Sequence, residues 1–446
     1  MRNKKYPFYQ VERVEELKQL VEGCGAKYGE KIAFRYWSRN EEVKKTYTNF
    51  CHDVKYLGTA FLNSGLKASN IAVIGENSYE WIVTYFAALT TGNVIVPFDK
   101  ELGREEIVGL LKESDCRAFV YASGYREAAE TAVRVFGSDL ILIAIEDIGD
   151  RFAASFSGLV NSGKRLIASG NTEFQNVIVK KEQLAAIHYT SGTTGISKGV
   201  MLTHGNIVSD AIGALRNVRA SGNTVLILPV HHTFGMTAGV ISMLHDGICI
   251  CINSSMKRIA PELKAYKPDF LMLVPLYVEA LYNKIWKKAE AAGRAGQLKM
   301  LCRLSNILLS VGLDLRKILF KAVLEGFGGA LELVVCGGAP MDPKYVKGFR
   351  TFGIEILNGY GITECSPIVS VNRNEYHRDG SVGTVLPCCE VMISDPDEHG
   401  EGEILVRGDN VMKGYYKNET ETAAVFSGAG SKQGISAGWT WTVSSI

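Results

Sequence analysis

The sequence predicts an α/β protein in which mainly parallel sheets are flanked by helices. Short apolar runs alternate with amphipathic helical patterns along the first half of the chain, which is typical of βαβ units. The chain has 446 residues, of which 46% are hydrophobic and 22% are charged, so it can bury a large core. At roughly 100–200 residues per domain, this length indicates about two to four structural units.

The elements follow one another in a regular order. Apolar residues at helical spacing predict a first helix over 11–25 that ends at Gly25. Apolar runs bounded by turn residues then predict strands, and the patterns between them predict helices. Strands are expected at 71–78, 93–99, 119–123, 224–230, 247–253, 270–275 and 331–338, and helices at 80–92 and 104–114. From Gly383 to Arg407 the pattern indicates β-rich hairpins.

Charge and composition exclude several classes of protein. The net charge is +2, from 49 basic and 47 acidic residues, whereas a nucleic-acid binder usually has a strongly basic domain. No apolar run reaches the roughly 18 residues of a membrane-spanning helix, and no signal-peptide core follows the N-terminus. The 10 cysteines lack zinc-site spacing. We therefore expect a cytoplasmic protein with reduced, mostly buried thiols and no nucleic-acid partner.

A loop rich in glycine and hydroxyl residues follows the strand-like run 185–189. It extends from Tyr189 to Gly199 and contains Lys198 near its end. Glycines allow backbone N–H groups to approach an anion, hydroxyls add donors, and a lysine adds a point charge suited to phosphate. No Ser or Thr follows Lys198, so this is not the GxxxxGK[ST] loop. We interpret it as a phosphate-binding loop, and a flexible surface loop is the alternative.

A second group of residues lies at 359–364. Tyr360 stands between glycines and can offer an open ring face to a base. Thr363 supplies a hydroxyl, and Glu364 supplies a hard oxygen ligand for Mg²⁺. Upstream, the stretch 337–340 follows a predicted strand, where its glycines would let a flat group lie against the backbone.

Together these motifs resemble the adenylate-forming superfamily, which includes acyl-CoA synthetases, firefly luciferase and the adenylation domains of peptide synthetases. The resemblance covers about residues 10–426. It rests on YTSGTTGxPKG at 189–199 (with Ser197 in place of proline), LPxxH at 228–232, GGAP at 337–340, YGxTE at 360–364, GEILVRG at 402–408 and VMxGY at 411–415.

The resemblance implies a fold and a reaction. The fold would be a large N-terminal domain over 1–426, with two mainly parallel, helix-flanked sheets and a β-rich subdomain at about 380–426. In the reaction, a carboxylate attacks the α-phosphate of ATP, pyrophosphate leaves, and a thiol, usually that of coenzyme A, attacks the acyl-adenylate.

The resemblance also assigns residues. Catalytic roles fall to Thr190, Lys198, His232 and Glu364, and Mg²⁺ would be bound by Thr190 and Glu364. The nucleotide would be bound by Thr190, Ser191, Gly192, Thr193, Thr194, Gly195, Lys198, Gly337, Gly338, Ala339, Pro340, Asn358, Gly359, Tyr360, Gly361 and Thr363.

The stretch from Pro229 to Ile241 indicates which class of carboxylic acid is the substrate. Peptide synthetases place an aspartate there to pair with the α-amine of an amino acid, and this stretch contains no acidic residue. A buried ammonium without a partner is costly, so a carboxylic acid without an amine is favoured, and the resemblance implies that this acid is a fatty acid. An aryl or short-chain acid, or an inactive remnant that binds nucleotide or acyl groups, stays open. We expect an apolar tunnel from His232 past Gly337 and Gly361.

The stretch 283–323 combines many basic residues with leucine, isoleucine and methionine. One interpretation is a basic amphipathic segment that contacts an anionic membrane surface from the cytoplasmic side and collects an acyl substrate there. The alternative is a solvated helical face over the core.

Residues 427–446 depart from the family pattern. The family continues into a mobile C-terminal domain of about a hundred residues that carries a catalytic lysine. In another reading frame, the codons of residues 439–442 specify Asp, then Met, Leu or Val, then Asp, which fits the family's Asp-x-Asp. We expect a frameshift near Gly430, a truncated and impaired chain, and a loosely packed tail. A divergent natural tail is the alternative.

Overall fold

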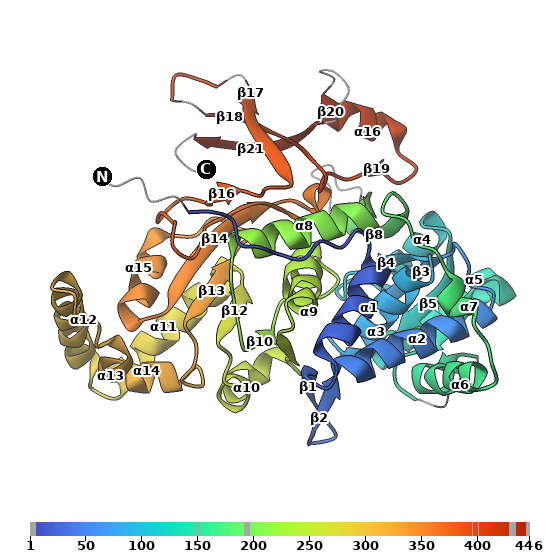
Figure 1. Cartoon of the computed structure of the whole chain (residues 1–446), viewed down its shortest axis with the longest axis horizontal. Coiled ribbons are helices and arrows are strands. Elements are labelled where there is room, and N and C mark those ends of the chain that lie inside the picture. The colour runs from blue at the N-terminus through green and yellow to red at the C-terminus, as the bar shows by residue number, and fades with distance from the viewer. Residues whose placement is uncertain are drawn as a thin grey trace.

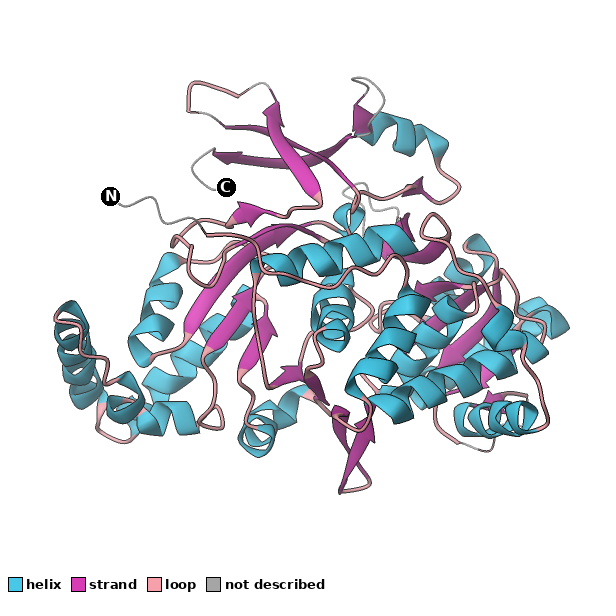
Figure 2. Ribbon diagram, viewed as in Figure 1, coloured by secondary structure: helices cyan, strands magenta, loops and turns pink. Residues whose placement is uncertain are grey.

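The computed structural model describes residues 6–147, 149, 152–190, 197–394, 396–399, 401–427 and 434–442, and only the backbone at 427 and 434–442. Two large sheets, each flanked by helices, form most of the molecule, and a smaller sheet lies beside them (Figures 1 and 2). This architecture confirms the predicted α/β fold with two mainly parallel sheets and a β-rich part.

The first large sheet has nine strands, in the order β16-β15-β14-β13-β12-β10-β11-β1-β2. Neighbours from β14 to β1 pair in parallel, and β2, β15 and β16 add antiparallel strands at the two ends. The strands are β1 (Ile32–Ser38), β2 (Glu41–Thr46), β10 (Asn223–Leu226), β11 (Cys249–Ile252), β12 (Phe270–Leu273), β13 (Leu333–Cys336), β14 (Glu355–Gly361), β15 (Ile368–Val371) and β16 (Thr384–Val385).

The second large sheet has eight strands, in the order β19-β9-β8-β4-β3-β5-β6-β7. It is parallel from β8 to β7, and β9 and β19 are antiparallel additions. The strands are β3 (Asn70–Ile74), β4 (Val94–Pro97), β5 (Cys116–Tyr121), β6 (Ile141–Ala144), β7 (Ala154–Ser155), β8 (Leu184–Thr190), β9 (Lys198–Thr203) and β19 (Gly414–Tyr415).

The small sheet contains β17 (Cys389–Ser394), β18 (Glu401–Gly408), β20 (Phe426–Ser427) and β21 (Gly434–Thr442). The hairpin of β17 and β18 confirms the β-rich pattern from Gly383 to Arg407. The backbone of β21 pairs with β18, so part of the departing tail adopts a strand. Residues 428–433 and 443–446 lie outside the described residues, and the frameshift stays a prediction.

The helices connect and cover the strands (Figure 2). They are α1 (Leu17–Tyr28), α2 (Tyr47–Asn63), α3 (Tyr79–Thr90), α4 (Arg104–Glu113), α5 (Arg126–Phe136), α6 (Phe156–Ala168), α7 (Glu173–Asn176), α8 (His204–Asn217), α9 (Ser242–His245), α10 (Ile259–Tyr266), α11 (Pro275–Ala291), α12 (Ala295–Ser310), α13 (Arg316–Leu319), α14 (Lys321–Glu325), α15 (Pro343–Phe352) and α16 (Glu419–Val425). Among the described residues, none of the helices is both long and apolar enough to cross a membrane.

The predicted limits of the first helix are wrong at both ends. The helix α1 begins at Leu17, because the Glu16 side chain accepts hydrogen bonds from the first backbone N–H groups. It continues past Gly25 and ends before Gly29, which adopts a positive φ of 48°. Gly25 serves packing instead, since a Cβ there would lie 2.6 Å from Sγ of Cys51 on α2.

One apolar core joins the sheets. Its largest cluster includes Ile71 and Ile95 from the eight-stranded sheet, Leu226 and Ile250 from the nine-stranded sheet, and Val406 from the small sheet. All ten cysteines are free thiols, and seven of them are buried, which confirms the interpretation of scattered structural thiols.

Candidate active site

The carboxyl ends of β13 and β14 form the centre of the candidate site. These parallel strands pair so that Cys336 lies beside Asn358, and the chain then continues as Gly337–Pro340 on one strand and 359–361 on the other. Ligands of open α/β sheets bind at this end of the strands. The two motifs that the sequence singled out are therefore neighbours in space.

Two cavities open at this edge. The first has a volume of about 220 Å³ and the second about 230 Å³. They share a wall made of Cys336, Gly338, Gly359, Tyr360, Gly361 and Ile362. The first cavity extends to Ala339–Met341, Asn358 and 380–382, and the second to 232–234, Val335, Gly337, Thr363, Pro367, Ile368 and Val371.

The second cavity matches the predicted course from His232 past Gly337 and Gly361. Only glycine fits at position 361 of its wall, because a Cβ there would lie 1.9 Å from the carbonyl oxygen of Pro367. No described residue lining this cavity is acidic. Among the described residues, the cavity wall therefore offers no carboxylate to pair with the ammonium group of an amino acid, and 232–234 supply none, as the sequence predicted.

Glu364 lies in a short 3₁₀ turn directly after β14 (Thr363–Cys365). Its Oε1 accepts a hydrogen bond of 2.9 Å from the hydroxyl of Tyr415 on β19, and its carbonyl oxygen accepts one of 2.8 Å from the backbone N–H of Met412. The segment 412–415 therefore fixes both the backbone and the carboxylate of Glu364.

Lys198 approaches the same tyrosine from β9. Its Nζ lies 5.4 Å from the ring centroid of Tyr415 and donates a hydrogen bond of 2.5 Å to Oε2 of Glu421 on α16. Lys198 and Glu364 thus both contact Tyr415, one at its ring and the other at its hydroxyl, but neither of them lines the two cavities. Thr190 pairs with Lys198 across β8 and β9, and its hydroxyl donates to the Lys198 carbonyl oxygen at 3.4 Å.

The middle of the predicted phosphate loop, Ser191, Gly192, Thr193, Thr194 and Gly195, lies outside the described residues. The described ends of that loop are the facing ends of β8 and β9. The sequence identified both of these ends, but it assigned no role to Tyr415 or Glu421. Tyr415 belongs to a matched motif, whereas no pattern marked Glu421 as the ionic partner of Lys198.

The histidines 231 and 232 follow β10 in a tight turn. The His232 N–H donates to the Pro229 carbonyl oxygen at 3.3 Å, and a Cβ at Gly235 would lie 2.2 Å from that oxygen, so only glycine fits. Asn77, which follows β3, holds the turn by donating to the Leu228 carbonyl oxygen at 2.9 Å and accepting from the Val230 N–H at 3.0 Å. Burial lowers the pKa of His231 to about 3, so its ring is neutral at pH 7.

His188 and His204 are buried away from the cavity walls. Nδ1 of His188 lies 3.2 Å from the His231 carbonyl oxygen, and Nδ1 of His204 accepts from the Leu17 N–H at 3.5 Å. Burial lowers the pKa of each histidine to about 4. These contacts indicate that both histidines have a structural role.

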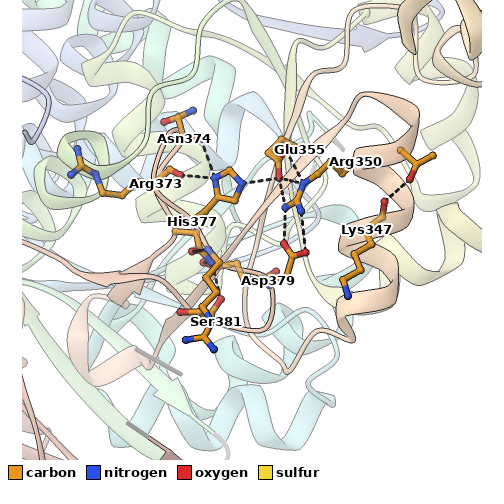
Figure 3. A network of polar contacts seen from close by, with 12 residues as sticks. Lys347, Arg350, Glu355, Arg373, Asn374, His377, Asp379 and Ser381 are labelled. Atoms are coloured by element: carbon orange, nitrogen blue, oxygen red, sulfur yellow. Dashed lines mark hydrogen bonds and ion pairs between the residues drawn. The ribbon is translucent and has the colours of Figure 1, made fainter. Parts of the chain in front are cut away.

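A network of charges lies next in sequence to residues 380–382, which line the first cavity (Figure 3). Arg350 on α15 donates to Glu355 at 2.7 Å and to both carboxylate oxygens of Asp379, at 2.6 and 3.0 Å. Nε2 of His377 lies 3.4 Å from the same Glu355 carboxylate. Because Asp379 precedes the cavity-lining residues 380–382, the network fixes that part of the wall.

Comparison with known proteins identifies the family to which the chain belongs. The model of the AMP-binding enzyme family matches residues 21–416. Long-chain-fatty-acid–CoA ligase 6 of Rattus norvegicus is 26% identical over 419 residues, which cover 86% of this chain and 58% of the rat protein. Long-chain-fatty-acid–[acyl-carrier-protein] ligase AEE15 of Arabidopsis thaliana is 27% identical, covering 93% of this chain and 65% of the plant protein. The chain thus spans less than two thirds of either relative.

Solved structures share the fold. The N-terminal domain of FACL13 from Mycobacterium tuberculosis superposes with a TM-score of 0.73 at 18% identity, covering 96% of this chain and 97% of that domain. The long-chain-fatty-acid–CoA ligase FadD1 from Archaeoglobus fulgidus gives a TM-score of 0.76 at 21% identity, covering 98% and 84% of the two chains. The family match covers most of the sequence and includes the strands that end at the two cavities, so this chain belongs to the AMP-binding enzyme family.

Proposed function

We propose that this protein uses ATP to activate a carboxylic acid, a long-chain fatty acid, as the acyl-adenylate and then transfers the acyl group to the thiol of coenzyme A. The observation that carries the proposal is the pair of cavities with a common wall at 359–362. A nucleotide in one cavity and an acid in the other would meet at this wall. The names of the relatives support the acid and the thiol.

The first cavity fits an adenine base. Asn358 is buried at its wall, and the side-chain Oδ1 has no hydrogen-bond partner among the described residues. A buried acceptor of this kind is satisfied by an amino group, such as the exocyclic amine of adenine. The ring of Tyr360 and the backbone of Gly338 and Ala339 line the same space and suit a flat base.

Glu364 and Thr190 fit a magnesium ion, because both offer hard oxygen atoms. When bound, Mg²⁺ neutralises phosphate charge during transfer. Lys198 would supply further positive charge to the β- and γ-phosphates, and Thr363 a hydroxyl to the α-phosphate. Attack on phosphorus depends on positioning and charge neutralisation, so the proposed reaction needs no protein nucleophile.

The identity of the acid substrate is tested with stable mimics of acyl-adenylates, in which a sulfamate replaces the phosphate. We expect the palmitoyl mimic to bind at least about a hundredfold more tightly than the leucyl mimic, because a buried ammonium would lack a partner. Calorimetric titration measures both constants. Tighter binding of a benzoyl or acetyl mimic would indicate the aryl or short-chain alternative, and tighter binding of the leucyl mimic would contradict the proposal.

Replacing Lys198 with methionine tests the phosphate assignment. Loss of a charge-assisted contact typically costs about 1.5–3 kcal/mol, so ATP affinity should fall roughly ten- to a hundredfold. The acyl-adenylate mimic lacks β- and γ-phosphates, and its affinity should change less than about threefold. The matched variant Glu421→Gln removes the anion that competes for Lys198, so it should strengthen ATP binding. Equal losses for both ligands in Lys198→Met would contradict the assignment.

A membrane contact through 283–323 is also proposed. The segment forms the end of α11, then α12, α13 and part of α14, at the left of the molecule in Figure 1. Seven large apolar side chains are exposed along it: Met300, Leu304, Ile307, Val311, Leu313, Leu315 and Ile318. Exposed basic residues accompany them: Lys284, Lys287, Lys288, Arg294, Lys299 and Arg303. Apolar insertion combined with attraction to anionic lipid would hold such a segment at a bilayer surface.

Vesicle flotation tests this contact. We expect the protein to float with vesicles that contain phosphatidylglycerol and to stay in solution with pure phosphatidylcholine. Changing Ile307, Val311 and Ile318 to serine should reduce the bound fraction at least about tenfold, since each loses apolar burial. The control Ile178→Ser alters a side chain that is 80% exposed elsewhere. Equal binding by the triple variant would favour the solvated-face alternative.

A further inference from the structure

Three possible metal ligands meet between the two large sheets. Asp99 follows β4 of the eight-stranded sheet, while His231 and His232 follow β10 of the nine-stranded sheet. One ligand atom from each of the three side chains lies within 4.8 Å of the other two. Among the described residues, this is the one group of three His, Cys, Asp or Glu side chains with such spacing.

We propose that Asp99, His231 and His232 bind a divalent transition-metal cation of the Zn²⁺ or Co²⁺ class. Two imidazoles and one carboxylate are the donor set of many sites for these cations, whereas Mg²⁺ prefers oxygen ligands alone. This site differs from the magnesium site proposed at Glu364, and it does not depend on the proposed reaction.

The geometry of one ligand pair already suits the cation. Nε2 of His231 lies 3.4 Å from Oδ1 of Asp99. Two ligand atoms of a tetrahedral zinc site, with bonds of roughly 2.0–2.1 Å, are about 3.3–3.4 Å apart. The exposed ring of His232 would need to move closer by a side-chain rotation, while the buried His231 and the half-exposed Asp99 would keep their positions.

The buried ring nitrogen is the second observation that points to a ligand. The His231 side chain is 5% exposed, and its Nε2 makes no hydrogen bond among the described residues. Buried ring nitrogens usually have a partner, and leaving one without a partner costs stability.

The surroundings permit a cation. The neighbouring Lys100 is paired with Glu76, with Nζ at 2.9 and 3.1 Å from the two carboxylate oxygens, so its charge is compensated. Oδ1 of Asp99 accepts a hydrogen bond of 2.9 Å from the Glu101 N–H, which orients the carboxylate. Asn77 fixes the backbone just before the two histidines through its contacts with Leu228 and Val230. A metal site requires ligand side chains that neighbouring groups hold in position.

Titration with Co²⁺, in the absence of nucleotide and magnesium, tests the site on the full chain. We expect one equivalent to bind at micromolar concentration, with visible absorption of a low-symmetry site and without the near-ultraviolet band of thiolate ligation. Zn²⁺ should displace the cobalt. A crystal soaked in Zn²⁺ should show one anomalous peak between Asp99 and His231.

The variants Asp99→Asn and His231→Gln should each weaken Co²⁺ binding at least about tenfold. Asp99 is about half exposed, so Asp99→Asn gives a result even if His231→Gln destabilises the protein. His399→Gln is the matched control, because Nε2 of this exposed histidine lies 3.6 Å from Glu398 without forming such a group of three. Absence of stoichiometric binding, unchanged affinity in both variants, or a thiolate band would overturn the proposal.

Discussion

Replacing His204 with glutamine is expected to make the protein more resistant to acid. Burial lowers the pKa of His204 to about 4, from an ordinary value of 6.5. Between these two values the unfolded state binds a proton that the folded state does not, so the folded state loses stability as the pH falls. From pH 7.5 to pH 5 this histidine should lower the free energy of unfolding by about 2 kcal/mol, roughly a thirtyfold change in the folding equilibrium.

The measurement is a series of urea unfolding curves between pH 5 and 7.5. His204→Gln should lose about 2 kcal/mol less than the natural chain over this range. The control Asp210→Asn alters a buried residue on the same helix, α8. It should change the pH dependence of stability in the opposite direction, because burial raises the pKa of the Asp210 carboxyl group well above its ordinary value. Parallel pH profiles for His204→Gln and the natural chain would show that His204 is protonated in the folded state.

Replacing Arg350 with methionine is expected to weaken both the fold and the first cavity. The guanidinium contacts Glu355 and Asp379, and all three side chains are less than one third exposed. Hydrogen bonds that Arg350 donates to both carboxylates raise its pKa, and the bond to Glu355 contributes most. Its removal leaves two half-buried carboxylates without their partner, which should cost about 2–3 kcal/mol of unfolding free energy after allowance for partial exposure.

Urea unfolding and binding of the palmitoyl-adenylate mimic measure the two effects. Because Asp379 holds residues 380–382 at the cavity wall, affinity for the mimic should fall roughly tenfold in Arg350→Met. Arg350→Lys should recover only part of both losses, since lysine cannot form the two-pronged contact. The control Arg407→Met breaks an exposed pair with Glu390 and should cost less than about 1 kcal/mol. A similar small cost for Arg350→Met would show that the network contributes no more than a surface pair.

The sequence predicted the strands around the site better than the contacts between them. Buried parallel strands are short apolar runs between turns, and such runs identified β3, β4, β10, β12 and β13. Gly337–Pro340 and 359–364 could be placed at strand ends because glycine and tyrosine interrupt the apolar pattern there. The start of α1 was missed because the helical spacing continues upstream of Glu16, whereas the helix begins where Glu16 caps it.

Contacts between residues that are distant along the chain could not be predicted from a single sequence. Glu421 is 223 positions from Lys198, and Asp379 is 29 positions from Arg350, so neither pair forms a local pattern. Asp99 follows a strand of one large sheet and His231 follows a strand of the other, so only the packing of the two sheets brings them together. Periodicity reports which face of an element is buried, but it does not report what that face meets.

The apolar core that joins Ile71, Leu226 and Val406 limits how the protein can be divided. Each large sheet has an apolar cluster of its own, but each also contributes residues to the shared core, so a gene fragment that encodes one sheet alone should expose apolar surface and produce an insoluble product. Proteases should encounter a single resistant body and not a set of separable modules. Recombination with relatives should succeed at exposed segments such as 396–399, and it should fail where a crossover separates β10 from the helices that cover it.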